Sequence, residues 1–323
     1  MLPSLGLCCM VTELRESKPP IFPSRRITLA TMNKPDGVDN LKQKILENLD
    51  DTLTILKWCR ANRITAYRMS SELFPHMSNP RAPDYTFDFA EEKLCEIGAF
   101  ARGNGIRLTF HPGQYNVVGT PNNDAFNQTC VDLKYHADVL DIMGMGKDSV
   151  MVVHGGGVYG NKEETINRWC EQFRKLPENV QQRLVLENCE KCFSVEDCLK
   201  VSDVVRVPVV FDTHHHDCYI KLHPDETLKD GGEYIGAILK TWSRRGIRPK
   251  FHVSEQGCGK LGHHSDYIEV MPDYLMRIKQ DFGVDVDVMI EAKMKEKAIK
   301  RLRDKYEKKE GKRPKRLVIV NSL

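Results

Sequence analysis

The sequence lacks two features that mark membrane and exported proteins. No window of the 323 residues comes near the roughly eighteen uninterrupted apolar residues of a transmembrane helix. The N-terminal stretch MLPSLGLCCM has neither the basic flank nor the long apolar region of a secretory signal. We therefore expect an intracellular protein, cytoplasmic or nuclear, that is not secreted and has no membrane partner.

Other motifs that are absent limit the kinds of ligand that we expect. No glycine-rich phosphate loop of the Walker type is present, so a nucleotide triphosphate is not implied. Cys189 and Cys192 have zinc or redox spacing, but a second such pair is missing. With no export signal, the eleven cysteines are interpreted as reduced thiols and small core residues. The low net charge of +3 neither demands nor excludes a nucleic-acid partner.

Short β-rich runs alternate with longer amphipathic stretches along the chain. Runs that are apolar at nearly every position are typical of strands buried on both faces, as in parallel sheets. Eight such runs alternating with helices predict a single-domain α/β TIM barrel, with a doubly wound sheet as the alternative. The runs are LGLCCMV near residue 8, TAYRMS near 67, IRLTFH to 111, SVMVVH to 154, RLVLEN to 188, VPVVFD to 212, KFHVS to 254 and VDVMIEA to 292.

The segments between and after these runs complete the predicted organisation. Apolar residues recur at three- and four-residue steps in residues 40–62, 89–105 and 124–146, which predicts helices there. Residues 11–38 are proline-rich and show little periodicity, so we expect a long first βα loop. The barrel domain is predicted over 1–296. A basic C-terminal extension follows over 297–323, beginning as a charged helix.

Residues of metal-ligand type stand at the ends of six consecutive predicted strands. In a parallel barrel these carboxyl ends converge on one face. A carboxylate that follows four apolar residues is costly to bury unless it is paired or binds a cation. The pattern therefore predicts a metal cluster. The six residues are His111, His154, Glu187, Asp212, His252 and Glu291.

Six ligands exceed one metal's usual share, and His215 and His264 lie close by in the sequence. We expect two or three divalent ions, with Glu187 able to bridge two of them. Carboxylate and imidazole ligands suit Mn²⁺, Zn²⁺ or Fe²⁺. Clustered metals of this kind serve the hydrolysis of phosphate esters, and the competing use on such a barrel is sugar isomerisation.

Eight ordered blocks of the sequence resemble those of the UV damage endonuclease family, over about residues 40–296. The resemblance implies a TIM barrel, as in endonuclease IV. It also implies a metal-dependent cut in damaged double-stranded DNA, made immediately 5′ of the damaged base by metal-activated hydroxide and leaving a 3′-hydroxyl. The blocks are YRMSSELFP (67–75), HPGQY (111–115), VVHGGG (152–157), LENCE (186–190), VVFDTHHH (209–216), RPKFHVSEQ (248–256), HHSDYI (263–268) and MIEAKMKE (289–296).

The resemblance also implies roles for particular residues. Lys250 falls beside the metals, where its amine is expected to be modified or to stabilise phosphate charge, although a solvated turn residue is the alternative. Gln114 and Tyr115 are expected to form a wedge that replaces damaged nucleotides in the base stack. Glu187, Glu291 and Lys250 are the expected catalytic residues. The expected metal ligands, with Mn²⁺ as the expected metal and a monomer as the expected state, are His111, His154, Glu187, Asp212, His215, His252, His264 and Glu291.

One departure from the family pattern concerns the metal site. Asn79 stands where relatives carry a histidine, so either Asn79 contacts a metal-bound water, or His76 substitutes, or one metal site is weakened. Three rival functions stay open: an abasic-site endonuclease of the endonuclease IV type, a damaged-DNA-binding protein with impaired catalysis, and a sugar isomerase.

Overall fold

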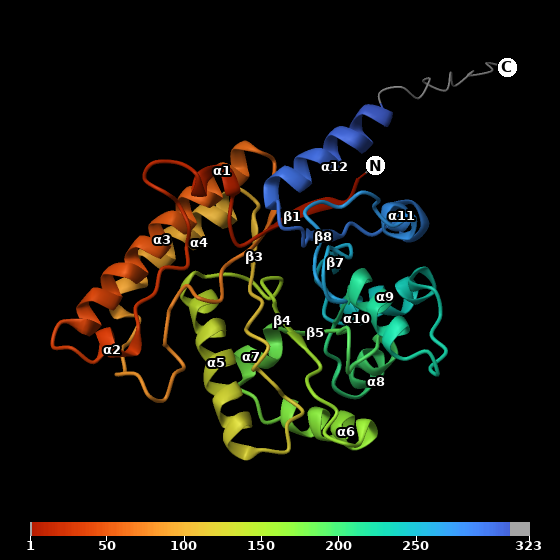
Figure 1. Ribbon diagram of the computed structural model, residues 1–323, viewed down its shortest axis with the longest axis horizontal. Helices are drawn as coiled ribbons and strands as arrows, with labels where there is room; N and C mark the ends of the chain where they lie inside the picture. The colour runs from red at the N-terminus through yellow and green to blue at the C-terminus, as the bar shows by residue number, and fades with distance from the viewer. Residues whose placement is uncertain (1, 311–323) are drawn as a thin grey trace.

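The computed structural model describes residues 2–310 of the chain. Within this range eight parallel strands form one sheet in the order β3-β2-β1-β8-β7-β6-β5-β4. A bridge between Phe110 and Met151 joins the two outermost strands and closes the barrel. Figure 1 shows the strands toward the centre of the molecule with helices around them. The expected TIM barrel is confirmed. The strands are β1 (Ser4–Cys8), β2 (Ala66–Arg68), β3 (Arg107–Thr109), β4 (Met151–His154), β5 (Leu184–Glu187), β6 (Val209–Asp212), β7 (Lys250–Val253) and β8 (Asp287–Ile290).

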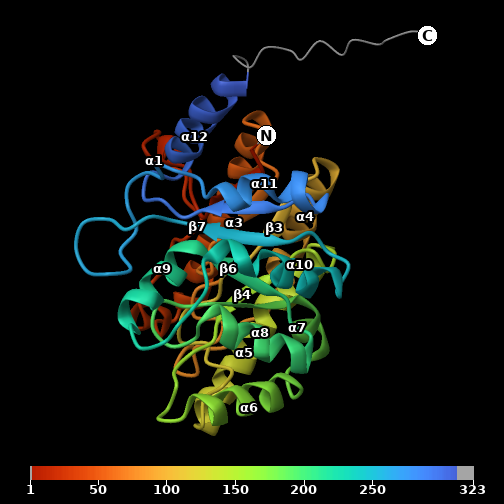
Figure 2. The ribbon, with the colours of Figure 1, turned by 90° about the vertical axis from the view of Figure 1, so that its right-hand side faces the viewer.

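Helices surround these strands. Figure 2 shows β4, β6 and β7 in the interior, with helices on the outside. The helices are α1 (Thr12–Arg15), α2 (Leu29–Met32), α3 (Gly37–Ala61), α4 (Glu91–Gly103), α5 (Asn123–Ile142), α6 (Lys162–Phe173), α7 (Glu178–Arg183), α8 (Val195–Val205), α9 (Thr213–Leu222), α10 (Ile235–Ser243), α11 (Asp273–Phe282) and α12 (Lys295–Glu310), with the 3₁₀ turns η1 (Asp88–Ala90) and η2 (Gly231–Tyr234).

The apolar runs form strands that lie between the helices and the barrel interior. Strands β5 to β8 are buried at every residue. Because successive side chains point to opposite faces, both faces of such a strand must be apolar or hydrogen-bonded. The same alternation places Lys250 and His252, two residues apart on β7, on the same face.

The barrel interior is packed with side chains rather than open. A Cβ atom added at Gly6 would lie 2.3 Å from Met289 Sδ and 3.2 Å from Ala66 Cβ. Glycine on β1 therefore leaves room for the side chains that β2 and β8 send into the interior. Cys8, Ala66 and Met289 form a buried cluster there.

Between β1 and α3 the chain has only the four-residue helices α1 and α2, which confirms the long first βα loop. Buried partners hold this loop against α3, because Arg25 N donates to Asn48 Oδ1 and Phe22 N donates to Asp51 Oδ2, both at 2.8 Å. The segment is therefore an ordered part of the barrel.

At the other end of the chain, α12 crosses the predicted boundary between residues 296 and 297, and packs against β1 and β8. The division into a barrel domain and an extension stays a prediction, because residues 311–323 lie outside the described range. Among the described helices, none has the length and apolar character needed to cross a membrane.

Candidate metal centre

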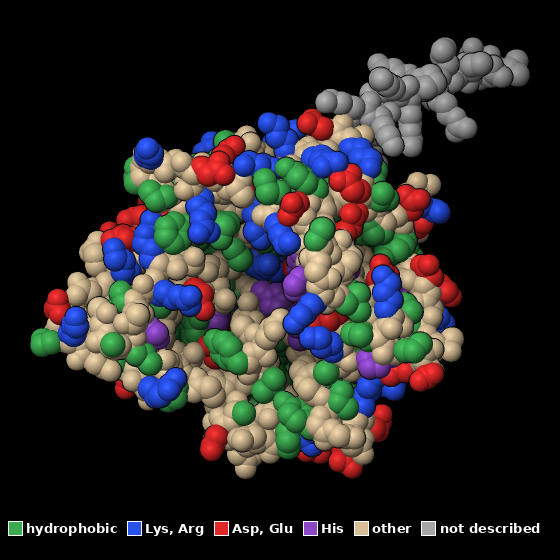
Figure 3. Space-filling model, viewed as in Figure 1, with side chains coloured by type: hydrophobic (Ala, Val, Ile, Leu, Met, Phe, Trp, Pro, Cys, Tyr) green, Lys and Arg blue, Asp and Glu red, His purple; other side chains and the backbone are tan. Residues whose placement is uncertain are grey.

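A hollow at the carboxyl ends of the strands gathers the predicted ligands. Figure 3 shows histidine side chains at its base with lysine and arginine side chains around it. The register brings neighbours together, since His154 pairs with Glu187 and Asp212 pairs with His252. The hollow corresponds to a pocket of about 300 Å³, lined among others by Arg68, His111, His154, His215, His264 and Glu291.

Glu187 lies at the centre of this arrangement and is fully buried. Its Oε2 atom lies 2.9 Å from His111 Nε2 and 3.1 Å from His154 Nε2. Its Oε1 atom lies 2.6 Å from His252 Nδ1 and 3.7 Å from His215 Nδ1. Burial alone would raise the pKa of Glu187, but His252, His154 and His111 hold it well below its usual range. The carboxylate thus stays charged with both oxygens facing histidines.

Asp212 links the end of β6 to α9 and fixes the position of His215. Its Oδ1 atom accepts a hydrogen bond from His215 N at 2.8 Å, so Asp212 is the N-cap of α9. Asn188 ties this turn to β5, because its side chain bonds the backbone of Asp212 in both directions. The backbone oxygen of Asn188 lies 3.0 Å from His215 Nδ1, which orients that ring.

Glu291 completes the set of carboxylates at the end of β8. It forms an ion pair with Arg68 from β2 and lies 3.2 Å from His252 Nδ1. Burial alone would raise the pKa of Glu291, but Arg68 and His252 hold it well below its usual range. Arg68 and Asn188 are not among the predicted site residues, although both stand at strand ends in the quoted blocks. Arginine and asparagine are not typical ligands of these metals, so the ligand pattern does not reveal them.

These side chains fit divalent metals. Three groups each bring three ligand atoms within 4.8 Å of one another. Within the described part of the chain, Asp212 Oδ2 and His252 Nε2 are buried and have no hydrogen-bond partner, which is unfavourable unless a cation or a water satisfies them. The groups are His111, Glu187 and His252; His154, Glu187 and His215; and Asp212, His252 and Glu291.

Lys250 lies deeper in the barrel, and only 1% of its surface is exposed. Its Nζ atom donates to Thr109 Oγ1 at 2.7 Å. Burial, with the nearby cations Arg107 and Arg68, lowers the pKa of Lys250 to about 7. The alternative of a solvated turn residue is therefore wrong, and the catalytic role stays a prediction.

The remaining predicted residues lie around the hollow. His264 is partly exposed, with Nδ1 4.0 Å from Glu291 Oε2. Gln114 lines the hollow, whereas Tyr115 and Asn79 line a neighbouring pocket of about 470 Å³. Of the histidines described, His264 does not belong to the three ligand groups. The ring of His76 lies near Asn79, and its Nε2 atom is 2.8 Å from the backbone oxygen of Ile27.

The fold and the site together define a class: a TIM-barrel protein with buried carboxylates and histidines that converge as a candidate metal centre. A family model described as UV-endonuclease UvdE matches residues 3–317, so the chain belongs to that family. The match extends beyond residues 40–296, on which the resemblance of the blocks is based.

Curated relatives agree with this assignment. A protein of Acanthamoeba polyphaga mimivirus is 39% identical over 94% of this chain and 91% of its own length. The UV-damage endonuclease of Schizosaccharomyces pombe is 34% identical over 94% of this chain, which spans only half of that protein. The UV DNA damage endonuclease of Bacillus velezensis is 33% identical, and the match covers 87% of this chain and 88% of that protein.

Solved structures place the fold in the same group. The crystal structure of SacUVDE matches with a TM-score of 0.79 and 32% identity, over 94% of this chain and 99% of that chain. Endonuclease IV from Thermus thermophilus matches with a TM-score of 0.52 and 17% identity, over 80% and 94% of the two chains. At this low identity the second likeness concerns the fold alone.

Proposed function

We propose that this protein is a DNA repair endonuclease that cuts the phosphodiester backbone immediately 5′ of UV photoproducts and leaves a 3′-hydroxyl. The observation that carries the proposal is the environment of Glu187, whose two buried oxygens face His111, His154, His215 and His252. The names of the family and of its curated relatives supply the substrate class.

The residues at the mouth of the barrel are suited to hold two or three divalent metals, with Mn²⁺ favoured over Zn²⁺ or Fe²⁺. Such metals supply Lewis acidity that activates water and neutralises charge on the phosphodiester. Glu187, Asp212 and Glu291 would provide the negative charge that holds them. Arg68 keeps Glu291 ionised and fixes one of its oxygens. Lys250 lies two residues before His252 on the same face of β7 and is buried below the ligands. From there its amine would offset the negative charge of the carboxylates.

Damage recognition falls to the loop that follows β3. Tyr115 exposes 60% of its surface and Gln114 lines the hollow beside it. Chemistry at a distorted lesion requires the damaged nucleotides to leave the base stack. An exposed aromatic ring beside an amide can replace lost stacking and hydrogen bonding, and base–aromatic stacking contributes about 1–3 kcal/mol per base.

The decisive experiment incubates the purified protein, with and without Mn²⁺, with end-labelled duplexes that carry a pyrimidine dimer, an abasic site or no lesion. We expect a metal-dependent cut one bond 5′ of the dimer and none in the undamaged duplex. Cutting only at the abasic site would instead support the endonuclease IV type of activity. Binding of damaged DNA without cutting under any metal condition would support the catalytically impaired protein.

Glu291→Gln should reduce cutting at the dimer by about a hundredfold or more, since even an outer partner of a metal ligand typically contributes roughly 10–100-fold. The amide keeps the shape but loses the charge that binds metal and pairs with Arg68. DNA affinity should be largely retained. A matched control is Glu269→Gln, which affects an exposed carboxylate paired with Arg301. Full activity of Glu291→Gln would remove this residue from the mechanism.

A further inference from the structure

A buried carboxylate outside the candidate metal centre joins two of the loops that surround it. Asp132 lies in the middle of α5 and is fully buried. Its Oδ1 atom accepts hydrogen bonds from Ser78 Oγ at 2.5 Å and from the hydroxyl of Tyr115 at 3.1 Å. Its Oδ2 atom accepts from Asn116 Nδ2 at 2.7 Å. The donors come from the loops after β2 and after β3.

The carboxylate at position 132 accepts its hydrogen bonds from side chains of these loops. A buried position on an amphipathic helix is normally apolar, and burying a carboxylate is unfavourable unless hydrogen bonds compensate it. The donors that compensate Asp132 belong to separate loop segments, so this one side chain links the two segments. Neighbouring residues of α5 reinforce the contact, because Thr129 Oγ1 accepts from Val117 N at 3.1 Å and Gln128 Nε2 donates to the backbone oxygen of Ser78.

The hydrogen bond to Asp132 fixes the position of the Tyr115 side chain. The tyrosine exposes 60% of its surface, while its hydroxyl is bound to Asp132. A Cβ atom at Gly113 would lie 2.4 Å from Tyr115 Cε1, so the ring rests against a glycine backbone. Asn116 N donates to Gly113 O at 3.0 Å and closes the turn on the other side. Ring and backbone are thus fixed before any DNA binds.

We propose that Asp132 is the positioning residue of the wedge: it anchors the hydroxyl of Tyr115 while much of the side chain stays exposed, keeps the ring in register with the loop of Ser78, and thereby sets lesion specificity. The inference rests on the proposed function, in which Tyr115 enters the damaged duplex. Because the restraint already exists in the free protein, the ring loses little conformational freedom on binding. Asp132 does not line the hollow that holds the ligands, and its effect is on recognition rather than on the chemical step.

The test compares Asp132→Asn, Tyr115→Phe and the double variant with the wild-type protein. The asparagine presents an N–H group toward donors that need an acceptor, whereas Tyr115→Phe removes one donor and keeps the ring. We expect each single variant to raise KM for the dimer duplex about tenfold with little change in kcat, the effect of losing one hydrogen bond to a charged group. If Asp132 acts through Tyr115, the double variant should be no worse than the single ones.

Asp138→Asn is the matched control. Asp138 lies on the same helix and pairs with Lys134 and Asn179, away from both loops. Hydrogen exchange of the free proteins provides a readout that does not depend on activity. Asp132→Asn should accelerate exchange in residues 111–120 and 76–80, whereas the Asp138 variant should leave these segments as in the wild type.

The outcomes separate the two proposals. Exchange that stays unchanged in Asp132→Asn overturns the positioning role, whether or not the protein cuts DNA. Additive losses in the double variant, or a fall in kcat with KM unchanged, also overturn it, because they indicate a general structural effect. If the wild-type protein fails to cut any lesion, the proposed function fails, and the exchange experiment still decides whether Asp132 restrains the loop.

Discussion

His136, one helical turn after Asp132, is a fully buried histidine with an uncommon environment. Its Nδ1 atom lies 2.8 Å from the backbone oxygen of Asp132, and its ring packs against Phe110 and Tyr135. Within the described residues its Nε2 atom has no hydrogen-bond partner. Burial lowers the pKa of His136 below its ordinary value despite the neighbouring Asp132 carboxylate.

This environment predicts an acid-sensitive contribution to stability. The folded-state pKa lies below the ordinary value near 6.5, so as pH falls below about 6.5 the unfolded chain takes up a proton that the folded chain refuses. Stability is therefore present above that pH and is lost as pH falls toward the folded-state pKa, by up to about 1.4 kcal/mol per pH unit.

His136→Phe keeps a ring in place and removes the titration. Urea unfolding at several pH values between 5 and 7.5 should show a shallower loss of stability for the variant than for the wild type. Any cost of the lost hydrogen bond is the same at every pH, so the slope isolates the proton. An identical slope in both proteins would show that His136 is not the group that titrates.

Single residues also show where sequence reasoning succeeds. The pattern of ligand-type residues at the ends of predicted strands identified Glu187, whose four histidine neighbours come from four other segments. The ends of parallel barrel strands converge regardless of the conformation of the loops. The same pattern could not predict the contact of Asp132 with Tyr115, since the sequence spacing does not indicate which face of α5 packs against which loop. The interior position of Lys250 follows from its place two residues before His252, an alternation that the sequence already contains.

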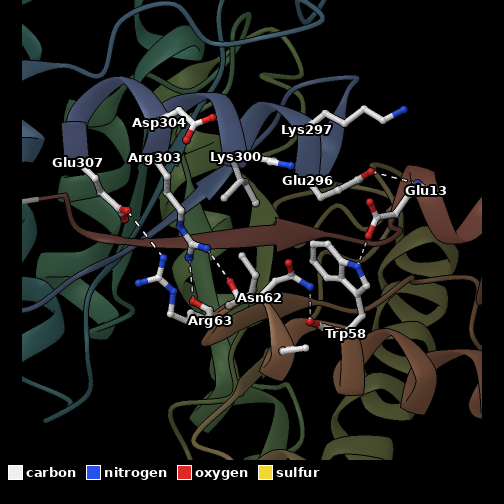
Figure 4. Close-up of a pocket in the computed structure, with 13 residues that line it drawn as sticks. Glu13, Trp58, Asn62, Arg63, Glu296, Lys297, Lys300, Arg303, Asp304 and Glu307 are labelled. Atoms are coloured by element: carbon white, nitrogen blue, oxygen red, sulfur yellow. Dashed lines mark hydrogen bonds and ion pairs between the residues drawn. The ribbon is translucent and has the colours of Figure 1, made fainter. Parts of the chain in front are cut away.

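At the scale of elements, α12 shows how the last helix secures the first part of the barrel. Glu296 is almost fully buried and accepts hydrogen bonds from Thr12 N at 2.8 Å and Glu13 N at 3.1 Å. N–H groups in the first turn of a helix have no partner within that helix, so a residue of α12 caps α1 near the N-terminus. Figure 4 shows this contact beside Arg303, which donates to the backbone oxygens of Asn62 and Arg63 after α3.

Glu296→Gln should lower the free energy of unfolding by about 1–3 kcal/mol, because the amide loses charge-assisted hydrogen bonds to two N–H groups and the favourable interaction with the helix dipole. Denaturant unfolding followed by circular dichroism measures this. Glu307→Gln on the same helix is the control, since Glu307 is half-exposed and lies 3.8 Å from Arg63. Such a surface pair contributes at most about 1 kcal/mol. Equal effects of the two substitutions would contradict the capping role.

The eight strands and the helices α3, α4 and α5 were predicted from the sequence, whereas α9 shows why other helices were not. The run of three histidines after Asp212 forms the first turn of α9, a helix that the sequence analysis does not predict. The segment THHHDCYIKL has a weak apolar periodicity, so pattern alone does not reveal the helix. Its N-cap signal is Asp212, the residue directly before the segment, which is also an expected metal ligand. Asp212 Oδ1 caps the helix, and Oδ2 has no hydrogen-bond partner among the described residues.

At the scale of the whole molecule, the candidate metal centre depends on barrel closure. Its carboxylates come from β5, β6 and the end of β8, and Arg68 comes from β2. No two neighbouring elements can form the site alone, so its geometry exists only when the sheet has closed. Three carboxylates with almost no solvent exposure repel one another there, so the folded state needs nearby positive charge, which Arg68 and the histidines supply and a bound metal would increase.

This arrangement predicts that divalent metal stabilises the entire fold. A metal that binds only the folded state raises stability by about 2.7 kcal/mol at a concentration one hundred times its Kd. Treatment with a chelator should therefore lower the melting temperature of the purified protein, and Mn²⁺ should restore it in proportion to the logarithm of its concentration. Thermal melts at a series of free Mn²⁺ concentrations measure the effect directly.

A variant of Glu187 shows whether the stabilisation comes from this centre. Glu187→Gln removes a carboxylate shared by two of the three ligand groups. It should show a smaller difference in melting temperature between chelator and Mn²⁺ than the wild type, because only the group of Asp212, His252 and Glu291 stays intact, whereas the exposed control Glu269→Gln should respond as the wild type does. A melting temperature of the wild-type protein that is indifferent to chelator and to added metal would contradict a metal cluster at the mouth of the barrel.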